Sequence, residues 1–255
     1  MNRRHIALIP AAGVGARFGA GKPKQYIRIH GKTVLEHTVA IFTQHPLIDL
    51  VAIVVSPDDP FINHLQTTSD KTVIFNVGGN TRAETVRNGV QTLMEKRLAD
   101  NHDNILVHDA ARCCLPQDAL SRLIQEAGTK AEGGILAIPA ADTIKRSATD
   151  GQILKTVPRT DLWQAQTPQL FQAGLLNRAL SASDLNGITD EASAVEQLGI
   201  RPLLVQGDIR NLKLTLPQDE FIIRLLLNTS ITSTKRSSEN QNLDFQTTFF
   251  RQAVK

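Results

Sequence analysis

Aromatic residues and separated cysteines are scarce in this chain of 255 residues. Phe, Trp and Tyr make up 4% of it, and the two cysteines, Cys113 and Cys114, are neighbours. Adjacent cysteines cannot link distant segments, and the sequence has no Cys-x-x-Cys or His-x-x-x-His pair of the kind that holds structural zinc. These absences indicate a protein that folds without disulfides in a reducing compartment.

Long apolar runs and a strong charge of one sign are also lacking. The apolar run near the N-terminus, residues 6–10, is too short for a secretory signal or a membrane span. The 28 basic and 25 acidic residues leave a formal net charge of +3, without the clustered basic residues and interleaved aromatics of nucleic-acid-binding proteins. We therefore expect a cytoplasmic protein that binds neither a membrane nor nucleic acid.

Short β-branched runs alternate along the chain with longer stretches of helical period. The expected strands are residues 6–9, 50–55, 72–75, 104–107 and 134–138. The expected helices are residues 34–43, 81–98, 116–127, a helix capped by Thr189 and ended by Gly199, and residues 217–227. Such an alternation is typical of the α/β class, with a mostly parallel sheet covered by helices on both faces.

Two segments interrupt this alternation. Residues 141–166 are polar and broken by Asp150-Gly151 and Pro158, which favours a protruding β-arm whose hairpin turns at Asp150-Gly151. From residue 229 onward Ser, Thr, Asn and Gln dominate without periodicity, which is typical of a disordered tail. The sequence thus predicts one folded domain, residues 1–228, followed by a disordered segment, residues 229–255.

A glycine-rich loop, residues 10–24, follows the first expected strand. Its glycines are Gly13, Gly15, Gly19 and Gly21, and its basic residues are Arg17, Lys22 and Lys24. Glycines let backbone N–H groups approach phosphate oxygens, and the carboxyl end of a strand is where open α/β sheets bind ligands. Basic side chains that repel one another beside such amides indicate a bound anion, and a triphosphate satisfies all of them.

Two common phosphate-binding motifs do not fit this loop. A dinucleotide-binding fingerprint needs a third glycine where Phe18 stands. A P-loop ending at Lys22 needs glycine in place of Ala16 and Ser or Thr in place of Pro23. The loop is therefore an anion cradle of another kind.

Asp109 follows the expected strand at residues 104–107 and should reach the same edge of the sheet as the glycine-rich loop. One carboxylate can hold Mg²⁺ when water and substrate phosphates complete the shell, although a lone Asp at a strand end is more often a cap. His108 beside it is more often a structural hydrogen-bonding residue than a general base. A phosphate acceptor needs no base, because it is already a dianion at neutral pH.

Eight strings stand out along the chain: PAAGVGARFG, KPKQY, GGNTRAETV, HDAAR, DTIKR, LWQAQTPQ, ITDEASAVE and NLKLT. Together they resemble the 2-C-methyl-D-erythritol 4-phosphate cytidylyltransferase family, in the order in which the family has them. The resemblance implies a Rossmann-like nucleotidyltransferase three-layer sandwich. It also implies transfer of CMP from CTP to 2-C-methyl-D-erythritol 4-phosphate in isoprenoid biosynthesis, with Mg²⁺ and a homodimer formed by arm exchange.

The resemblance assigns roles to individual residues. It implies that Arg17 and Lys24 stabilise the pentacoordinate phosphorus and that Arg159 and Lys213, the latter on an expected late strand, position the acceptor. The residues implied to contact CTP are Pro10, Ala11, Ala12, Gly13, Gly15, Gly79, Asn80 and Thr85. The residues implied to contact acceptor or metal are Arg112, Thr143, Thr167 and, for the metal, Asp109. Without the resemblance, Arg159 and Lys213 would read as surface charges.

The chain departs from the family pattern at a few positions, and other functions stay open at this point. Cys113 stands where proline is usual, and Arg210 stands where an acidic residue often is, so Asp208 is left out of the metal set. A ribitol 5-phosphate cytidylyltransferase is the first alternative, because acceptor choice depends on pocket shape. A regulatory nucleotide binder should have lost Arg17, Lys24 or Asp109, and an NAD(P) oxidoreductase should carry the dinucleotide fingerprint.

Overall fold

A computed structural model of the chain describes residues 3–13, 22–66, 69–181, 185 and 187–228. Within these residues a seven-stranded sheet has the order β11-β7-β10-β6-β1-β4-β5. Its strands are β1 His5–Pro10, β4 Leu50–Val54, β5 Thr72–Phe75, β6 Asn104–Val107, β7 Gly134–Pro139, β10 Trp163–Gln172 and β11 Leu203–Gln206. Neighbouring strands run parallel except at β10, which is antiparallel to both β6 and β7.

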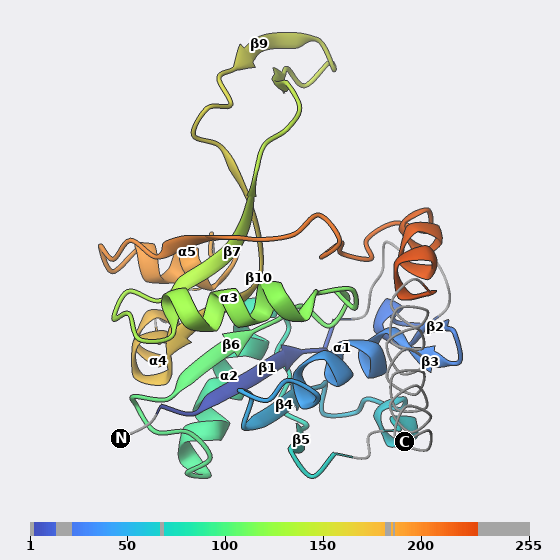
Figure 1. The fold of residues 1–255 in the computed structure, drawn as a ribbon, viewed down its shortest axis with the longest axis vertical. Coiled ribbons are helices and arrows are strands. Elements are labelled where there is room, and N and C mark those ends of the chain that lie inside the picture. Colours follow the sequence, from blue (N-terminus) through green and yellow to red (C-terminus); the bar gives the residue numbers. More distant parts are fainter. Residues whose placement is uncertain (1–2, 14–21, 67–68, 182–184, 186, 229–255) are drawn as a thin grey trace, which may run out of the picture.

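Helices cover both faces of this sheet and make it the middle of three layers (Figure 1). The helices are α1 Val34–Thr43, α2 Arg82–Glu95, α3 Gln117–Ala127, α4 Ala173–Leu180 and α5 Glu191–Glu196. Side chains of β1 alternate between the layers: Ile9 packs in one cluster with Phe42 of α1, and Leu8 packs in the other with Val90 of α2. The expected three-layer α/β sandwich is thereby confirmed.

Capping residues explain where the first helices begin. Thr33 caps α1 and Thr81 caps α2, each in a capping box with a Glu three residues later. Two predicted starts are wrong by one residue. Pro116 is the cap of α3 rather than its first residue, and Asp190 caps α5 in place of Thr189 because its carboxylate accepts from the N–H of Ser193.

The predicted arm is present but shorter than expected. Its hairpin consists of β8 Ile144–Ser147 and β9 Ile153–Val157 and projects from the body of the molecule (Figure 1). The turn lies at Asp150-Gly151 as predicted, with Gly151 at φ +84°. The arm ends before residue 163, because Trp163 pairs with Pro139 and so belongs to the sheet.

The late strand predicted around Lys213 is wrong. Residues 211–215 lie outside any strand, beside the segment that follows β6, where the N–H of Leu214 donates to the carbonyl oxygen of Ala111. Residues 219–228 are helical, close to the prediction.

The smaller elements of the described residues lie outside the main sheet. They are two short hairpin strands, β2 Arg28–Ile29 and β3 Lys32–Thr33, and two 3₁₀ turns, η2 Lys24–Tyr26 and η3 Ile62–His64. No helix in the described ranges is long and apolar enough to cross a bilayer.

Candidate functional site

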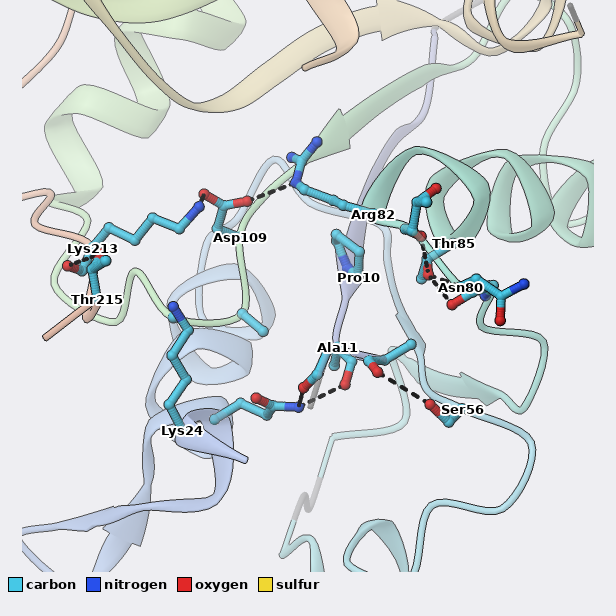
Figure 2. Close-up of a pocket in the computed structure, with 17 residues that line it drawn as sticks. Pro10, Ala11, Lys24, Ser56, Asn80, Arg82, Thr85, Asp109, Lys213 and Thr215 are labelled. Atoms are coloured by element: carbon cyan, nitrogen blue, oxygen red, sulfur yellow. Dashed lines mark hydrogen bonds and ion pairs between the residues drawn. The ribbon is translucent and has the colours of Figure 1, made fainter. Parts of the chain in front are cut away.

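A cavity of about 560 Å³ opens at the carboxyl ends of β1 and β6. It is lined by many of the residues expected from the sequence: Pro10, Ala11, Ala12, Gly13, Lys24, Gly79, Asn80, Thr85, Asp109 and Lys213. Parallel strands bring the loops that follow them to one edge of the sheet, which is why residues so far apart in the chain meet here. Figure 2 shows how these side chains surround the cavity.

The loop after β1 forms one wall, and its backbone is held by two side chains from other segments. The Gln25 amide, 4% exposed, donates to the carbonyl oxygens of Ala11 at 2.8 Å and Gly13 at 2.9 Å. The Ser56 hydroxyl donates to the carbonyl oxygen of Ala12 at 3.1 Å. The entry to the glycine-rich loop is therefore fixed before any ligand arrives.

Glycine is required at position 78, where the segment after β5 approaches the loop after β1. A Cβ on Gly78 would lie 2.4 Å from the Cβ of Ala12 and 2.8 Å from the carbonyl oxygen of Val55. Neither neighbour can move easily, because Ala12 has no longer side chain to rotate and the other atom belongs to the backbone. Glycine at position 78 therefore lets the segment after β5 pack directly against the loop after β1.

The start of α2 forms the next wall. The N–H of Gly79 donates to the Thr85 hydroxyl at 3.1 Å, and that hydroxyl donates to the carbonyl oxygen of Thr81 at 2.9 Å. The N–H of Asn80 donates to the Glu84 carboxylate at 2.7 Å. This wall presents backbone polar groups and a helix N-terminus, which are the usual partners of ribose hydroxyls and phosphates.

Asp109 provides the negative charge of the site. Its Oδ1 contacts Nε of Arg82 at 2.9 Å, and its Oδ2 contacts Nζ of Lys213 at 2.8 Å and Nε of Arg112 at 3.4 Å. Its N–H donates to the Thr167 hydroxyl. Burial alone would raise the pKa of Asp109, but these cations hold that pKa well below its usual range. The carboxylate is therefore ionised at neutral pH.

His108 is buried and has structural partners. Its Nε2–H donates to the carbonyl oxygen of Arg112, and its Nδ1 accepts from the Thr167 hydroxyl. Burial lowers the pKa of His108 to about 4, so the ring is neutral at physiological pH. Since it already donates and accepts inside the protein, His108 is not available as a general base.

The remaining predicted residues fall into separate groups. Arg112 and Thr167 contact Asp109, Arg112 at the carboxylate and Thr167 at the backbone N–H. Thr143 and Arg159 are exposed, and neither is among the described residues that line the cavity. Gly15 and Arg17 lie outside the described residues. The roles expected for these side chains stay predictions.

Several residues that shape the cavity were not predicted. Arg82, Gln25 and Ser56 contact predicted site residues directly, and Glu191 holds the guanidinium of Arg82. The family-like strings include Arg82, Gln25 and Glu191, and those strings were the available signal. No local spacing rule could have paired Arg82 with Glu191, because 109 residues separate them.

A magnesium ion fits Asp109 chemically. In the described part of the chain, no three His, Cys, Asp or Glu side chains gather as a complete metal-binding group. Mg²⁺ does not need such a group, since one carboxylate with water and substrate phosphates satisfies it. Asp109 is ionised and lines a cavity of about 560 Å³, which leaves room beside it for phosphates and water.

Comparison with known proteins identifies relatives of the chain. A family model described as 2-C-methyl-D-erythritol 4-phosphate cytidylyltransferase (IspD) matches residues 5–228. A protein of that name from Neisseria meningitidis serogroup C is 68% identical over 228 residues, which are 89% of this chain and 99% of the relative. One from Chromobacterium violaceum is 50% identical over 87% of this chain and 97% of its own length.

Solved structures agree with this comparison. A crystal structure of a 4-diphosphocytidyl-2C-methyl-D-erythritol synthase is 61% identical, covers 89% of this chain and 99% of its own, and superposes with a TM-score of 0.80. The 2-C-methyl-D-erythritol 4-phosphate cytidylyltransferase of Francisella tularensis is 34% identical, covers 88% and 99% of the two chains, and gives a TM-score of 0.75. Sequence and fold therefore indicate the same relatives.

Proposed function

The chain belongs to the 2-C-methyl-D-erythritol 4-phosphate cytidylyltransferase family, and we propose from that premise which of its residues carry the reaction. It is a cytidylyltransferase of the non-mevalonate pathway that forms 4-diphosphocytidyl-2-C-methyl-D-erythritol. One observation carries the assignment of residues. The ionised Asp109, paired with Lys213 at 2.8 Å, faces the same cavity as Lys24 and the small residues after β1.

CTP occupies the side of the cavity formed by small residues and backbone. Its proposed contacts are Pro10, Ala11, Ala12, Gly13, Gly15, Gly79, Asn80 and Thr85. The fixed carbonyl groups of residues 11–13 and the polar start of α2 support this orientation of the nucleotide. The triphosphate then points toward Lys24 and Asp109, which extend into the cavity from η2 and from the segment after β6 (Figure 2).

Group transfer proceeds by direct attack. A phosphate oxygen of methylerythritol phosphate forms a bond to the α-phosphorus of CTP, the bond to the bridging oxygen breaks, and pyrophosphate leaves with that electron pair. Arg17 and Lys24 stabilise the charge on the pentacoordinate phosphorus. Asp109 would hold Mg²⁺, and the ion would supply positive charge to the phosphates. No general base is needed, and the neutral, internally bonded His108 supports this reading.

The acceptor side is proposed to be shared between two chains. Arg159, Lys213, Arg112, Thr143 and Thr167 position the methylerythritol phosphate. Arg159 and Thr143 belong to the arm, which projects from its own body (Figure 1). The arm also exposes Ile153 and Leu154 by 65% and 63%. We therefore propose a homodimer in which each arm completes the cavity of its partner.

A pyrophosphate-release assay tests the proposed substrates. Purified protein with Mg²⁺ is given CTP, UTP, ATP or GTP, each with methylerythritol phosphate or ribitol 5-phosphate. We expect turnover with CTP and methylerythritol phosphate and its loss when Mg²⁺ is chelated. Preference for ribitol 5-phosphate would contradict the acceptor, and turnover without a divalent cation would contradict the role of Asp109.

We also propose a cytoplasmic location, which the absence of disulfides among the described residues supports.

A further inference from the structure

Arg82, the first residue of α2, is bonded through every nitrogen of its guanidinium. Its Nε donates to Oδ1 of Asp109 at 2.9 Å. Its terminal nitrogens donate to the two carboxylate oxygens of Glu191, at 2.6 Å and 3.1 Å. A bidentate Arg–carboxylate pair fixes the plane of the guanidinium, so the direction of the remaining N–H toward Asp109 is fixed as well.

Glu191 is itself held firmly. It is the first residue of α5 and only 1% exposed. The neighbouring residues tie the start of α5 to the sheet, since the buried Gln169 of β10 donates to Asp190 and accepts from the N–H of Ala192, both at 2.8 Å. The carboxylate that orients Arg82 therefore rests on a central strand.

The other cations at Asp109 are held differently. Lys213 contacts Asp109 through its single side-chain nitrogen, its side chain is 39% exposed, and it lies in a segment outside any strand. Arg112 is at 3.4 Å and gives a shorter bond, 2.6 Å, to the carbonyl oxygen of Asn211. An incoming phosphate or cation can displace the Lys213 ammonium at less cost than the clamped guanidinium of Arg82.

We propose that Arg82 is a positioning residue. Clamped by Glu191, it fixes Oδ1 of Asp109, and Lys213 is the partner that releases Oδ2 when substrates enter the cavity. This inference rests on the proposed function. It assigns the released Oδ2 of Asp109 to the magnesium ion that accompanies CTP, and it assigns the released Lys213 ammonium to the acceptor. It adds Arg82 and Glu191 to the residues on which turnover depends.

Charge and position can be separated with variants of this pair. Arg82→Gln removes a positive charge, Glu191→Gln removes a negative charge, and the double variant removes both while keeping the amides able to hydrogen-bond. Replacing both members of a buried ion pair is much less harmful to folding than removing one. Arg82→Lys keeps the charge but cannot reach both carboxylates in the same geometry.

The proposal predicts opposite metal effects and a shared loss of turnover. The half-saturating Mg²⁺ concentration should rise about three- to tenfold in Glu191→Gln and fall by a similar factor in Arg82→Gln, because a nearby charge changes cation affinity. It should stay within about twofold of the parent in the double variant and in Arg82→Lys, since the net charge is unchanged. In all of them kcat should fall on the order of tenfold or more, because Asp109 is misplaced.

Direct metal binding gives a readout other than activity. Mn²⁺ binding to each variant is monitored by electron paramagnetic resonance, with CTP present and acceptor absent. The Mn²⁺ affinities should rank the variants in the same order as the half-saturating Mg²⁺ concentrations. The matched control is the remote pair Arg4–Asp103, in which two guanidinium nitrogens donate to one oxygen of a buried carboxylate. Arg4→Gln with Asp103→Asn should leave kcat and metal affinity at parent values.

The outcomes separate this inference from the proposed function. If the parent protein shows no CTP-dependent turnover, the proposed function fails. If the parent is active and the folded double variant or Arg82→Lys keeps parent kcat, Arg82 is not a positioning residue. Equal metal affinity in Arg82→Gln and Glu191→Gln would also overturn the proposal, because a purely structural pair would leave the metal unaffected. Thermal unfolding of each variant verifies that the comparison is made on folded protein.

Discussion

The two sides of the cavity are built in different ways. The side assigned to CTP consists of backbone held by the side chains of Gln25 and Ser56, and nearly all of it comes from strand ends and the start of α2. The side assigned to the acceptor depends on long side chains such as Lys213 and Arg159, in an irregular segment and on the arm. The nucleotide side is therefore preorganised in one chain, while in the homodimer that we propose the acceptor side would be completed only when substrates and a partner arm arrive.

Removing Lys24 should give the largest effect on activity. We expect Lys24→Ala to lower kcat on the order of 10²-fold or more, because a preorganised contact to the transition state is lost. Steady-state kinetics with saturating CTP and acceptor measure this directly. Lys22→Ala is the matched control on the same loop, because Lys22 is not among the described residues that line the cavity, and it should retain most of the activity. Unchanged turnover in Lys24→Ala would remove this lysine from the transition state.

Truncation on the acceptor side should affect binding of one substrate selectively. Arg159→Ala should raise the KM for methylerythritol phosphate about tenfold or more with little change in the KM for CTP, because one charge-assisted contact to phosphate is lost. Lys213→Ala should act in the same direction. The neighbouring exposed Lys155→Ala is the control for a general loss of arm charge. An unaltered acceptor KM in Arg159→Ala would exclude it from the site.

A change at Gln25 tests the preorganised side. Gln25→Leu keeps a buried side chain of similar size but cannot donate to the carbonyl oxygens of Ala11 and Gly13. Leaving the buried carbonyl oxygen of Ala11 without its donor costs about 1–3 kcal/mol. We expect a several-fold higher KM for CTP, an unaltered KM for the acceptor, and a lower thermal midpoint. Equal effects on both substrates would show that the two sides are not independent.

Acidification tests the lowered pKa of the buried His108. Of these changes it should have the smallest effect on the reaction rate, because His108 does not take part in the reaction. The folded-state pKa of His108 is lowered to about 4, while an unfolded chain titrates near 6.5. Between these values the unfolded state binds the proton and the folded state does not, so stability falls with decreasing pH by about 1 kcal/mol per pH unit. Denaturant unfolding from pH 7 to 4.5 measures this slope. His108→Gln should reduce the slope, and an unchanged slope would contradict the lowered pKa.

Much of the fold could be predicted because its signals are local. Thr33 with Glu36 and Thr81 with Glu84 mark helix starts within four residues of sequence, and the β-branched runs mark buried parallel strands. β10 was missed in part because Pro168 argues against an interior strand. Its pairing with β7 is irregular between Ala165 and Gln169, which accommodates that proline.

The site was predictable to the extent that strand ends determine it. Gly13 and Asp109 each follow a parallel strand, so their meeting at one edge follows from the class of fold. The roles of Arg159 and Lys213 came from the family resemblance, since a lone basic residue carries no local signal. The Arg82–Glu191 clamp depends on how the starts of α2 and α5 meet in space, and no pattern in the sequence encodes that meeting.

Mixing two impaired variants tests most directly that the acceptor side is completed by a partner chain. Lys24→Ala and Arg159→Ala proteins are combined in equal amounts, dissociated and reassociated, and assayed at an acceptor concentration well below the parent KM, where both are impaired, with each variant alone as the control. Random pairing should restore about one quarter of parent activity, because half of the dimers contain one cavity with an intact Lys24 and a partner arm with an intact Arg159. Activity no higher than that of the separate variants would contradict the account, because it would mean that each arm serves its own chain.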